Sequence, residues 1–120
     1  MTSAARRHLL AAEALRPGAH RGVAGYLYGI AAECAIKAMM QASGPRLNDA
    51  FYKHFPELRT ILRNTLQGRR SQTLARFVAD DSFMNNWDIH MRYADARQIR
   101  DEWIDKWAEQ ARRAVSAMGT

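Results

Sequence analysis

The sequence predicts an all-α protein, folded as an up-and-down bundle of four to five helices in a single domain over residues 1–120. Alanine occurs 21 times, and the three prolines all fall between segments with helical periodicity. No segment shows the alternation of apolar and polar residues that indicates a half-buried strand. A chain of this length buries about two-thirds of its unfolded surface, so its core needs neither disulfides nor a structural metal.

The first two helices are expected over residues 3–16 and 20–42. Ser3 is the expected N-cap of the first helix, which Pro17 and Gly18 end. The second helix is apolar on nearly every side, and such a helix is normally central, with neighbours on several faces.

Four glycines, Gly18, Gly22, Gly25 and Gly29, follow one another at spacings of four, three and four residues. Each glycine inside a helix costs up to about 1 kcal/mol relative to alanine. The last three of these glycines lie on one face of the second helix. We therefore expect another helix to approach that face closely, either within the bundle or across a dimer interface.

The middle of the chain is broken by turn residues. Residues 46–54 are expected to form a loop or a short helix, and a third helix begins at Pro56 and ends by Gly68. Ser71 is the expected cap of a further short helix. The sequence therefore predicts short elements between the long helices.

Residues 80–93 are rich in turn residues and are expected to be mostly irregular. The last helix is expected over residues 95–118, because apolar residues recur there every three or four positions. These residues are Ala96, Ile99, Trp103, Trp107, Ala111, Ala114 and Met118.

Three polar residues, Glu33, Lys37 and Gln41, form one line along the apolar second helix. One interpretation is a solvated edge with an exposed ion pair, which contributes about 0.2–0.5 kcal/mol. The other is that Glu33 is partly buried and pairs with an arginine from another element, for which Arg92 is the candidate.

Several chemically versatile side chains lie together in residues 87–93. His90 is a candidate acid or base, Arg92 a candidate phosphate ligand and Tyr93 a candidate stacking partner for a base. The alternative is that Trp87, Met91 and Tyr93 close the end of the bundle while Arg92 pairs with a carboxylate.

The net charge of +6 is concentrated in residues 46–76, which hold seven basic and two acidic residues. Fifteen of the 18 basic residues are arginine, which suits bidentate contacts with phosphate. This pattern favours an RNA or nucleotide partner, although a solvated arginine-rich surface has the same composition. The candidate RNA-binding patch consists of Arg59, Arg63, Arg69 and Arg70.

Nothing else in the sequence indicates catalysis, a metal or a cofactor. The single cysteine, Cys34, is expected to be an inert thiol on the central helix, and its isolation favours a reducing compartment, the cytoplasm. No apolar run approaches the length of a membrane span.

The segment Ala31-Ala32-Glu33-Cys34-Ala35-Ile36-Lys37, preceded by Gly25-Tyr26-Leu27-Tyr28-Gly29, resembles the second helix of bacterial HEPN-domain proteins. That helix often reads Gly-Tyr-x-x-x-x-x-Glu-Cys-x-Leu-Lys. The likeness continues at residues 11–15, at His54, and at Trp87, Arg92 and Tyr93, and it covers most of the chain.

The resemblance implies a HEPN-like helical bundle that commonly forms homodimers. It also implies a role in RNA cleavage, nucleotide binding or toxin–antitoxin systems, often beside a nucleotidyltransferase partner protein. In nuclease members an Arg-x4–6-His motif near the last long helix supplies the active site across the dimer. This sequence lacks that motif, and His90 and Arg92 occur in the reverse order.

Three functional hypotheses follow. The first is a HEPN-like domain that binds RNA or a nucleotide through Glu33, Lys37, Arg92 and Tyr93, or that acts as a partner in a toxin–antitoxin or nucleotidyltransferase module. The second is an active metal-independent ribonuclease that uses His90 and Arg92 across a dimer. The third is a structural helical module for protein interaction.

Overall fold

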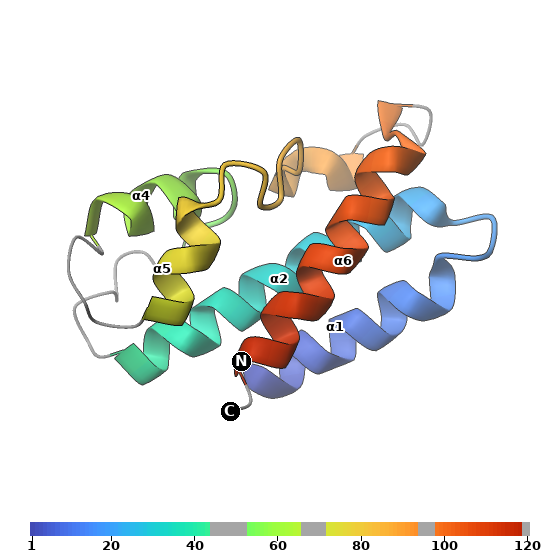
Figure 1. The fold of residues 1–120 in the computed structure, drawn as a ribbon. Helices are drawn as coiled ribbons and strands as arrows, with labels where there is room; N and C mark the ends of the chain where they lie inside the picture. Colours follow the sequence, from blue (N-terminus) through green and yellow to red (C-terminus); the bar gives the residue numbers. More distant parts are fainter. Residues whose placement is uncertain (44–52, 66–71, 94–97, 119–120) are drawn as a thin grey trace.

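Five α-helices and one short 3₁₀ helix form the regular structure of the residues that the structure describes, which confirms the all-α prediction (Figure 1). The computed structural model describes residues 1–43, 53–65, 72–93 and 98–118, and of residues 42, 43, 64, 65, 72, 92 and 93 only the backbone. The elements are α1 (Thr2–Leu15), α2 (Arg21–Ser43), α4 (Glu57–Thr65), α5 (Gln72–Ala79), the 3₁₀ helix η2 (Ile89–Tyr93) and α6 (Asp101–Met118).

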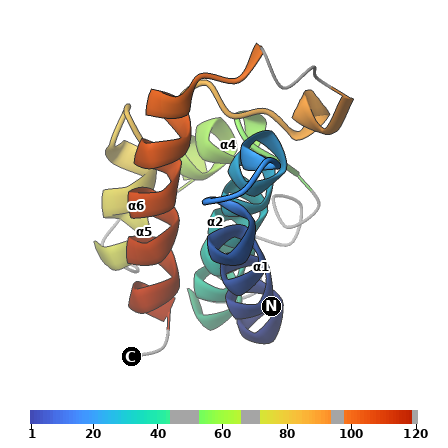
Figure 2. The ribbon, with the colours of Figure 1, turned by 90° about the vertical axis from the view of Figure 1, so that its right-hand side faces the viewer.

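The three long helices form the main bundle. Helices α1 and α2 are antiparallel neighbours joined by a short turn, and α6 packs against both (Figures 1 and 2). Asp105 near the start of α6 pairs with Arg16 at the end of α1, at 2.6 Å. Asp101 pairs with Arg21 at the start of α2, at 2.9 Å. Helix α6 therefore runs antiparallel to α1 and in the same direction as α2.

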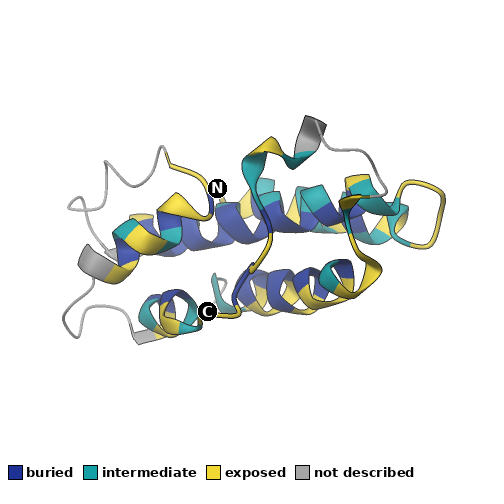
Figure 3. Cartoon of the chain, turned by 90° about the horizontal axis from the view of Figure 1, so that it is seen from above, coloured by how far each residue is buried: buried dark blue, intermediate teal, exposed yellow. Residues whose placement is uncertain are grey.

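Helix α2 is the central helix, as its composition predicts. Its buried residues continue along the whole helix, whereas α6 alternates between buried and exposed faces (Figure 3). Small side chains such as Ala24, Ala31 and Ala35, all fully buried, let the neighbouring helices approach α2 closely.

Two of the predicted glycine positions accommodate close approaches within the chain. A Cβ atom at Gly25 would lie 3.1 Å from Ile104 and from Trp107 on α6. A Cβ atom at Gly29 would lie only 1.9 Å from the indole of Trp87, which comes from the loop before η2. The expected helix approach is thus confirmed at Gly25, whereas a single side chain approaches Gly29. Both positions are covered without a second subunit.

A cluster of aromatic side chains joins α4, α5 and the loop over residues 80–88 to the end of the main bundle. Phe55 packs edge-on against Phe83 and Trp87, at centroid distances of 5.7 and 6.2 Å. Trp87 stacks on Tyr26 of α2 at 5.8 Å, and Phe77 of α5 packs against Phe83 at 5.2 Å. The expectation that Trp87 plugs the bundle is confirmed, because only 2% of its surface is exposed.

A polar network ties α1, α2 and α6 together. The carboxylate of Glu13 accepts hydrogen bonds from the hydroxyl of buried Tyr28, at 2.6 Å, and from both Nε and Nη2 of Arg112. The guanidinium of Arg112 lowers the pKa of Glu13, and burial raises the pKa of Tyr28. The network therefore contributes most to stability when Glu13 is ionised.

Two predicted helix ends are wrong. Helix α6 begins at Asp101, six residues after the expected start at residue 95, and the carbonyl of Arg100 accepts its first hydrogen bonds. The acidic pair Asp101 and Glu102 stabilises a helix start at this point through the helix dipole. Ser3 lies inside α1, which Met1 caps through its backbone.

Residues 80–93 are mostly irregular, as predicted, with η2 at their end. The loop expected over residues 46–54 falls largely outside the described residues, as do the expected terminator Gly68 and the expected cap Ser71. None of the helices in the described part of the chain combines the length and the apolar composition that a bilayer crossing requires.

Candidate functional site

Glu33 is a buried carboxylate near the middle of α2, with 3% of its surface exposed. Its Oε1 atom accepts hydrogen bonds from Nδ1 of His54, at 2.7 Å, and from Nζ of Lys37, at 3.4 Å. Its Oε2 atom accepts from the backbone N–H of Phe55, at 3.0 Å. Glu33 is therefore buried and paired with a residue from another element, as expected, but its pairing with an arginine stays a prediction. The described partner is His54, and the side chain of Arg92 lies outside the described residues.

The start of α4 holds His54 in place. The carbonyl of His54 accepts a hydrogen bond from the N–H of Leu58, at 2.8 Å, so His54 forms the N-terminal boundary of the helix. Phe55 is buried in the aromatic cluster, and its N–H bond to Glu33 fixes the adjoining backbone. The backbone on the C-terminal side of His54 is thus fixed by two hydrogen bonds, one to Leu58 and one to Glu33.

The pair of Glu33 and His54 has the geometry of an oriented acid or base. Because an ionised carboxylate only accepts hydrogen bonds, Nδ1 of His54 carries the hydrogen. The other ring nitrogen, Nε2, makes no hydrogen bond to any residue that the structure describes, and 48% of the side chain is exposed. A neutral His54 therefore presents an acceptor to solvent, and a protonated one presents a donor.

Lys37 belongs to the same buried group. Its side chain is 8% exposed, and it faces Glu33 one turn along α2. The solvated-edge interpretation of these two residues is therefore wrong, because both side chains are buried and His54 and Phe55 bond to Glu33 from the segment before α4. A buried pair depends on both charges, since loss of one member typically costs 3–5 kcal/mol.

The second group of predicted site residues, in residues 87–93, is described only in part. His90 is exposed and hydrogen-bonds through Nδ1 to Asp88 Oδ1, at 2.8 Å. The backbone N–H of His90 also donates to Asp88 and lowers its pKa. The side chains of Arg92 and Tyr93 lie outside the described residues. Met91 packs against the core, as the end-of-bundle interpretation predicts.

Two arginines of the predicted patch, Arg59 and Arg63, make hydrogen bonds within the fold. Arg59 is half-buried and donates to the carbonyls of Asp81, at 3.2 Å, and Phe83, at 2.6 Å. Arg63 donates to the carbonyl of Val78, at 2.8 Å, and to the carboxylate of Asp81, at 2.8 Å. Arg63 lies on the exposed side of α4, as expected, with 44% of its side chain exposed, whereas Arg59 is only half-exposed. Both residues bind the end of α5 and the loop that follows it, and their binding of RNA stays a prediction. Arg69 and Arg70 lie outside the described residues.

Cys34 lies beside Glu33 on α2 and is half-buried. Burial, followed by the neighbouring Glu33 carboxylate, raises the pKa of its thiol. The thiol is therefore a poor nucleophile, as expected.

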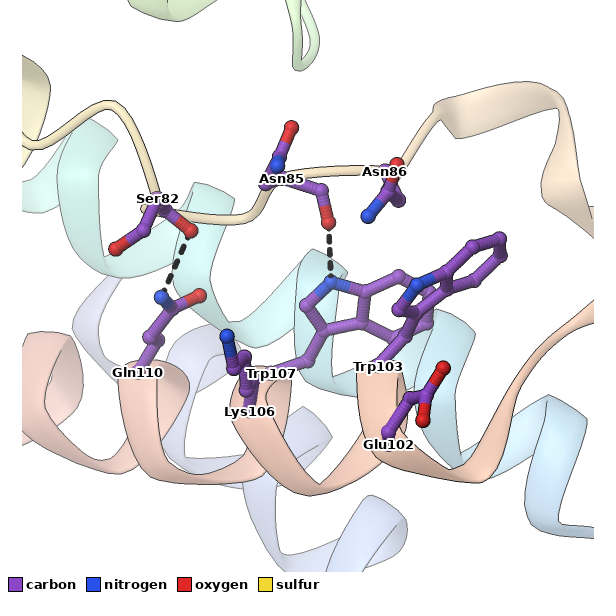
Figure 4. Close-up of a pocket in the computed structure, with 8 residues that line it drawn as sticks. All are labelled: Ser82, Asn85, Asn86, Glu102, Trp103, Lys106, Trp107 and Gln110. Atoms are coloured by element: carbon purple, nitrogen blue, oxygen red, sulfur yellow. Dashed lines mark hydrogen bonds between the residues drawn. The ribbon is translucent and has the colours of Figure 1, made fainter.

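A pocket that the sequence does not predict lies between α6 and the loop after α5 (Figure 4). Its volume is about 310 Å³. The sequence signal that could have indicated it is Gln110, a polar residue within the apolar stripe of α6 and 7% exposed. The lining residues are Ser82, Asn85, Asn86, Glu102, Trp103, Lys106, Trp107 and Gln110.

The described residues contain no cluster of three or more histidine, cysteine, aspartate or glutamate side chains arranged to hold a metal ion. Comparison with known proteins finds no family model, no curated protein and no solved structure that matches this chain.

Proposed function

We propose that this chain is a HEPN-like domain that binds RNA or a ribonucleotide, with Glu33, Lys37 and His54 at its centre. The observation that carries the proposal is the buried carboxylate of Glu33, which holds a half-exposed imidazole by its Nδ1 atom. The net charge of +6 supports it, because a positive domain attracts a polyanion at long range.

The geometry suits a ribose hydroxyl better than a phosphate. Glu33 neutralises the ammonium group of Lys37, so the site has little surplus positive charge while His54 is neutral. A neutral His54 presents Nε2 as an acceptor, and the 2′-hydroxyl of RNA can donate to it. DNA lacks this hydroxyl, so the proposal predicts that the domain prefers RNA.

The test compares single-stranded RNA and DNA of one sequence by fluorescence anisotropy at several salt concentrations. Wild type should bind RNA more tightly than DNA, by about 2- to 10-fold for one hydrogen bond. His54→Ala should bring the two affinities together, whereas His90→Ala, at an exposed histidine that pairs with Asp88, should leave the preference unchanged. Equal affinity of wild type for RNA and DNA would refute the proposal.

A second candidate function is metal-independent RNA cleavage. A histidine oriented by a carboxylate is the arrangement of a general base, which in RNA cleavage removes the 2′-hydroxyl proton. The structure supports His54 for this role on geometry, in place of the predicted His90. Cleavage that His54→Ala abolishes and His90→Ala preserves would support this candidate, and intact RNA after incubation with wild type would exclude it.

The resemblance adds two proposals about context, a homodimer and a nucleotidyltransferase partner as in toxin–antitoxin modules. The single cysteine, Cys34, adds a third, a location in the reducing cytoplasm. Because α6 and Trp87 cover Gly25 and Gly29, the dimer would form on another face. Sedimentation analysis tests the homodimer, and a monomer at all concentrations would refute it. A domain that binds neither RNA nor nucleotide would favour the structural interaction module.

A further inference from the structure

The pocket over α6 is a built feature, because three side-chain hydrogen bonds fix its rim. Gln110 accepts a hydrogen bond from the N–H of Met84 and donates one to the carbonyl of Ser82, both at 2.8 Å. Trp107 donates from Nε1 to the carbonyl of Asn85, also at 2.8 Å. The loop is thus held at a fixed height above the helix (Figure 4).

The backbone at this rim adopts conformations that need such support. Met84 has a φ of 54° and Asn86 a φ of 70°, both in the left-handed region. A long side chain such as that of Met84 is rarely found there, and residues of this kind persist only where surrounding contacts hold them. The two positive φ values set the direction of the Asn86 side chain.

The pocket combines an aromatic ring with polar groups that lack partners. Trp103 is half-buried, and the guanidinium of Arg100 lies 5.5 Å from its ring centroid. Among the described residues, the carboxamide of Asn86 and the ammonium of Lys106 have no hydrogen-bond or ionic partner. The Asn86 side chain points from the loop toward the Trp103 indole, whereas Lys106 rises from the helix beside Gln110, with the Trp107 ring between it and Trp103 (Figure 4).

We infer that this pocket takes one nucleobase, supplied either by a free nucleotide or by an unpaired RNA residue. This inference rests on the proposed function for the presence of such a ligand. A tryptophan ring is a platform for base stacking, which tolerates any base. The carboxamide of Asn86 offers a donor and an acceptor side by side, the pair that matches the edge of adenine. Lys106 supplies positive charge for the attached phosphate.

The size of the pocket agrees with this ligand. A volume of about 310 Å³ lies at the lower end of the range for small-molecule sites, roughly 300–1,000 Å³. The nearby carboxylate of Glu102 pairs with Arg100 at 3.5 Å, so the ammonium of Lys106 is the surplus charge among these three side chains. A single neutral base fits these conditions better than a polyphosphate does.

The experiment measures binding of AMP by calorimetry and of a labelled oligoadenylate by anisotropy. Trp103→Ala should weaken binding about 5- to 150-fold, as expected for one stacked base, whereas Trp103→Phe should retain most of the affinity. Asn86→Gly removes the carboxamide while glycine tolerates the positive φ, so it tests base recognition without a backbone conflict. It should reduce the preference for adenylate over uridylate.

Two outcomes identify the source of the base. Weakening of both ligands by Trp103→Ala means that a free nucleotide suffices, and weakening of the oligonucleotide alone means that the base comes from RNA. Oligonucleotide binding unchanged by both Trp103→Ala and Asn86→Gly would overturn the inference.

His54→Ala separates this inference from the proposed function. It should leave AMP affinity within about twofold of wild type, because the base pocket does not include His54. If Trp103→Ala weakens binding but wild type does not prefer RNA to DNA, the proposed function is refuted and the base pocket is supported. The reverse pattern would refute the pocket alone, and failure of wild type to bind either ligand would refute both.

Discussion

Gly29 offers a sharp test of the packing, because replacing it with alanine sets helix propensity against steric overlap. The added Cβ atom would lie 1.9 Å from Cε2 and 2.0 Å from Nε1 of Trp87. Carbon atoms in contact prefer about 3.5 Å or more, so the overlap is about 1.6 Å. The indole cannot move aside easily, because Tyr26 and Phe55 enclose it.

The expected magnitude follows from two opposing terms. Alanine gains about 1 kcal/mol of helix propensity, and overpacking on this scale costs about 3 kcal/mol or more. The net expectation for Gly29→Ala is a loss of about 2 kcal/mol in the free energy of unfolding. Gly25→Ala, with its nearest contacts at 3.1 Å, should change stability by less than about 1 kcal/mol.

A double-mutant cycle isolates the overlap. Trp87→Ala alone should cost about 3–5 kcal/mol. In that background Gly29→Ala meets no indole and should stabilise the helix by about 1 kcal/mol, which gives a coupling energy of about 3 kcal/mol. Urea unfolding followed by circular dichroism measures the free energy of unfolding of wild type, of both single variants and of the double variant. A neutral or stabilising effect of Gly29→Ala in the wild-type background would show that the indole does not occupy this position.

Two further predictions concern buried and partly buried charge. Glu33→Gln should lower the free energy of unfolding by about 3–5 kcal/mol, because it removes the charge that faces Lys37 inside the protein; urea unfolding equal to wild type would contradict the buried pair. Glu13→Gln should cost on the order of 1–2 kcal/mol at neutral pH. Because folding lowers the pKa of Glu13, this difference is full above its ordinary value of 4.5 and shrinks as the pH falls through the folded pKa. Unfolding curves from neutral to acidic pH check this, and a difference independent of pH would count against the Arg112 contact.

Local sequence patterns predict most of the helical structure. Proline and glycine positions predict both ends of α2 and the start of α4 to within one residue, because these residues limit helices directly. The start of α6 is missed because Ile99 continues the apolar stripe, whereas the first helical hydrogen bonds form only at Arg100. Periodicity indicates which face is apolar and does not show where the hydrogen bonding begins.

The sequence predicts a residue of the candidate site only where the pattern within a single helix makes that residue stand out. Glu33 stands out because a charge interrupts an otherwise apolar helix. Its partner His54 lies 21 residues away, and only the family resemblance points to that position. The roles of Arg59 and Arg63 are missed because a charge count cannot distinguish an arginine that binds phosphate from one that binds backbone carbonyls.

The loop between α5 and η2 takes part in both candidate sites. On one side Phe83 and Trp87 support Phe55, whose N–H holds Glu33. On the other side Gln110 fixes the same loop as the roof of the base pocket. A ligand that moves this loop therefore also moves Phe83 and Trp87, which pack against Phe55 next to the Glu33 carboxylate. The loop thus couples the two sites, and thermodynamics requires that binding at either site change the affinity of the other by the same factor.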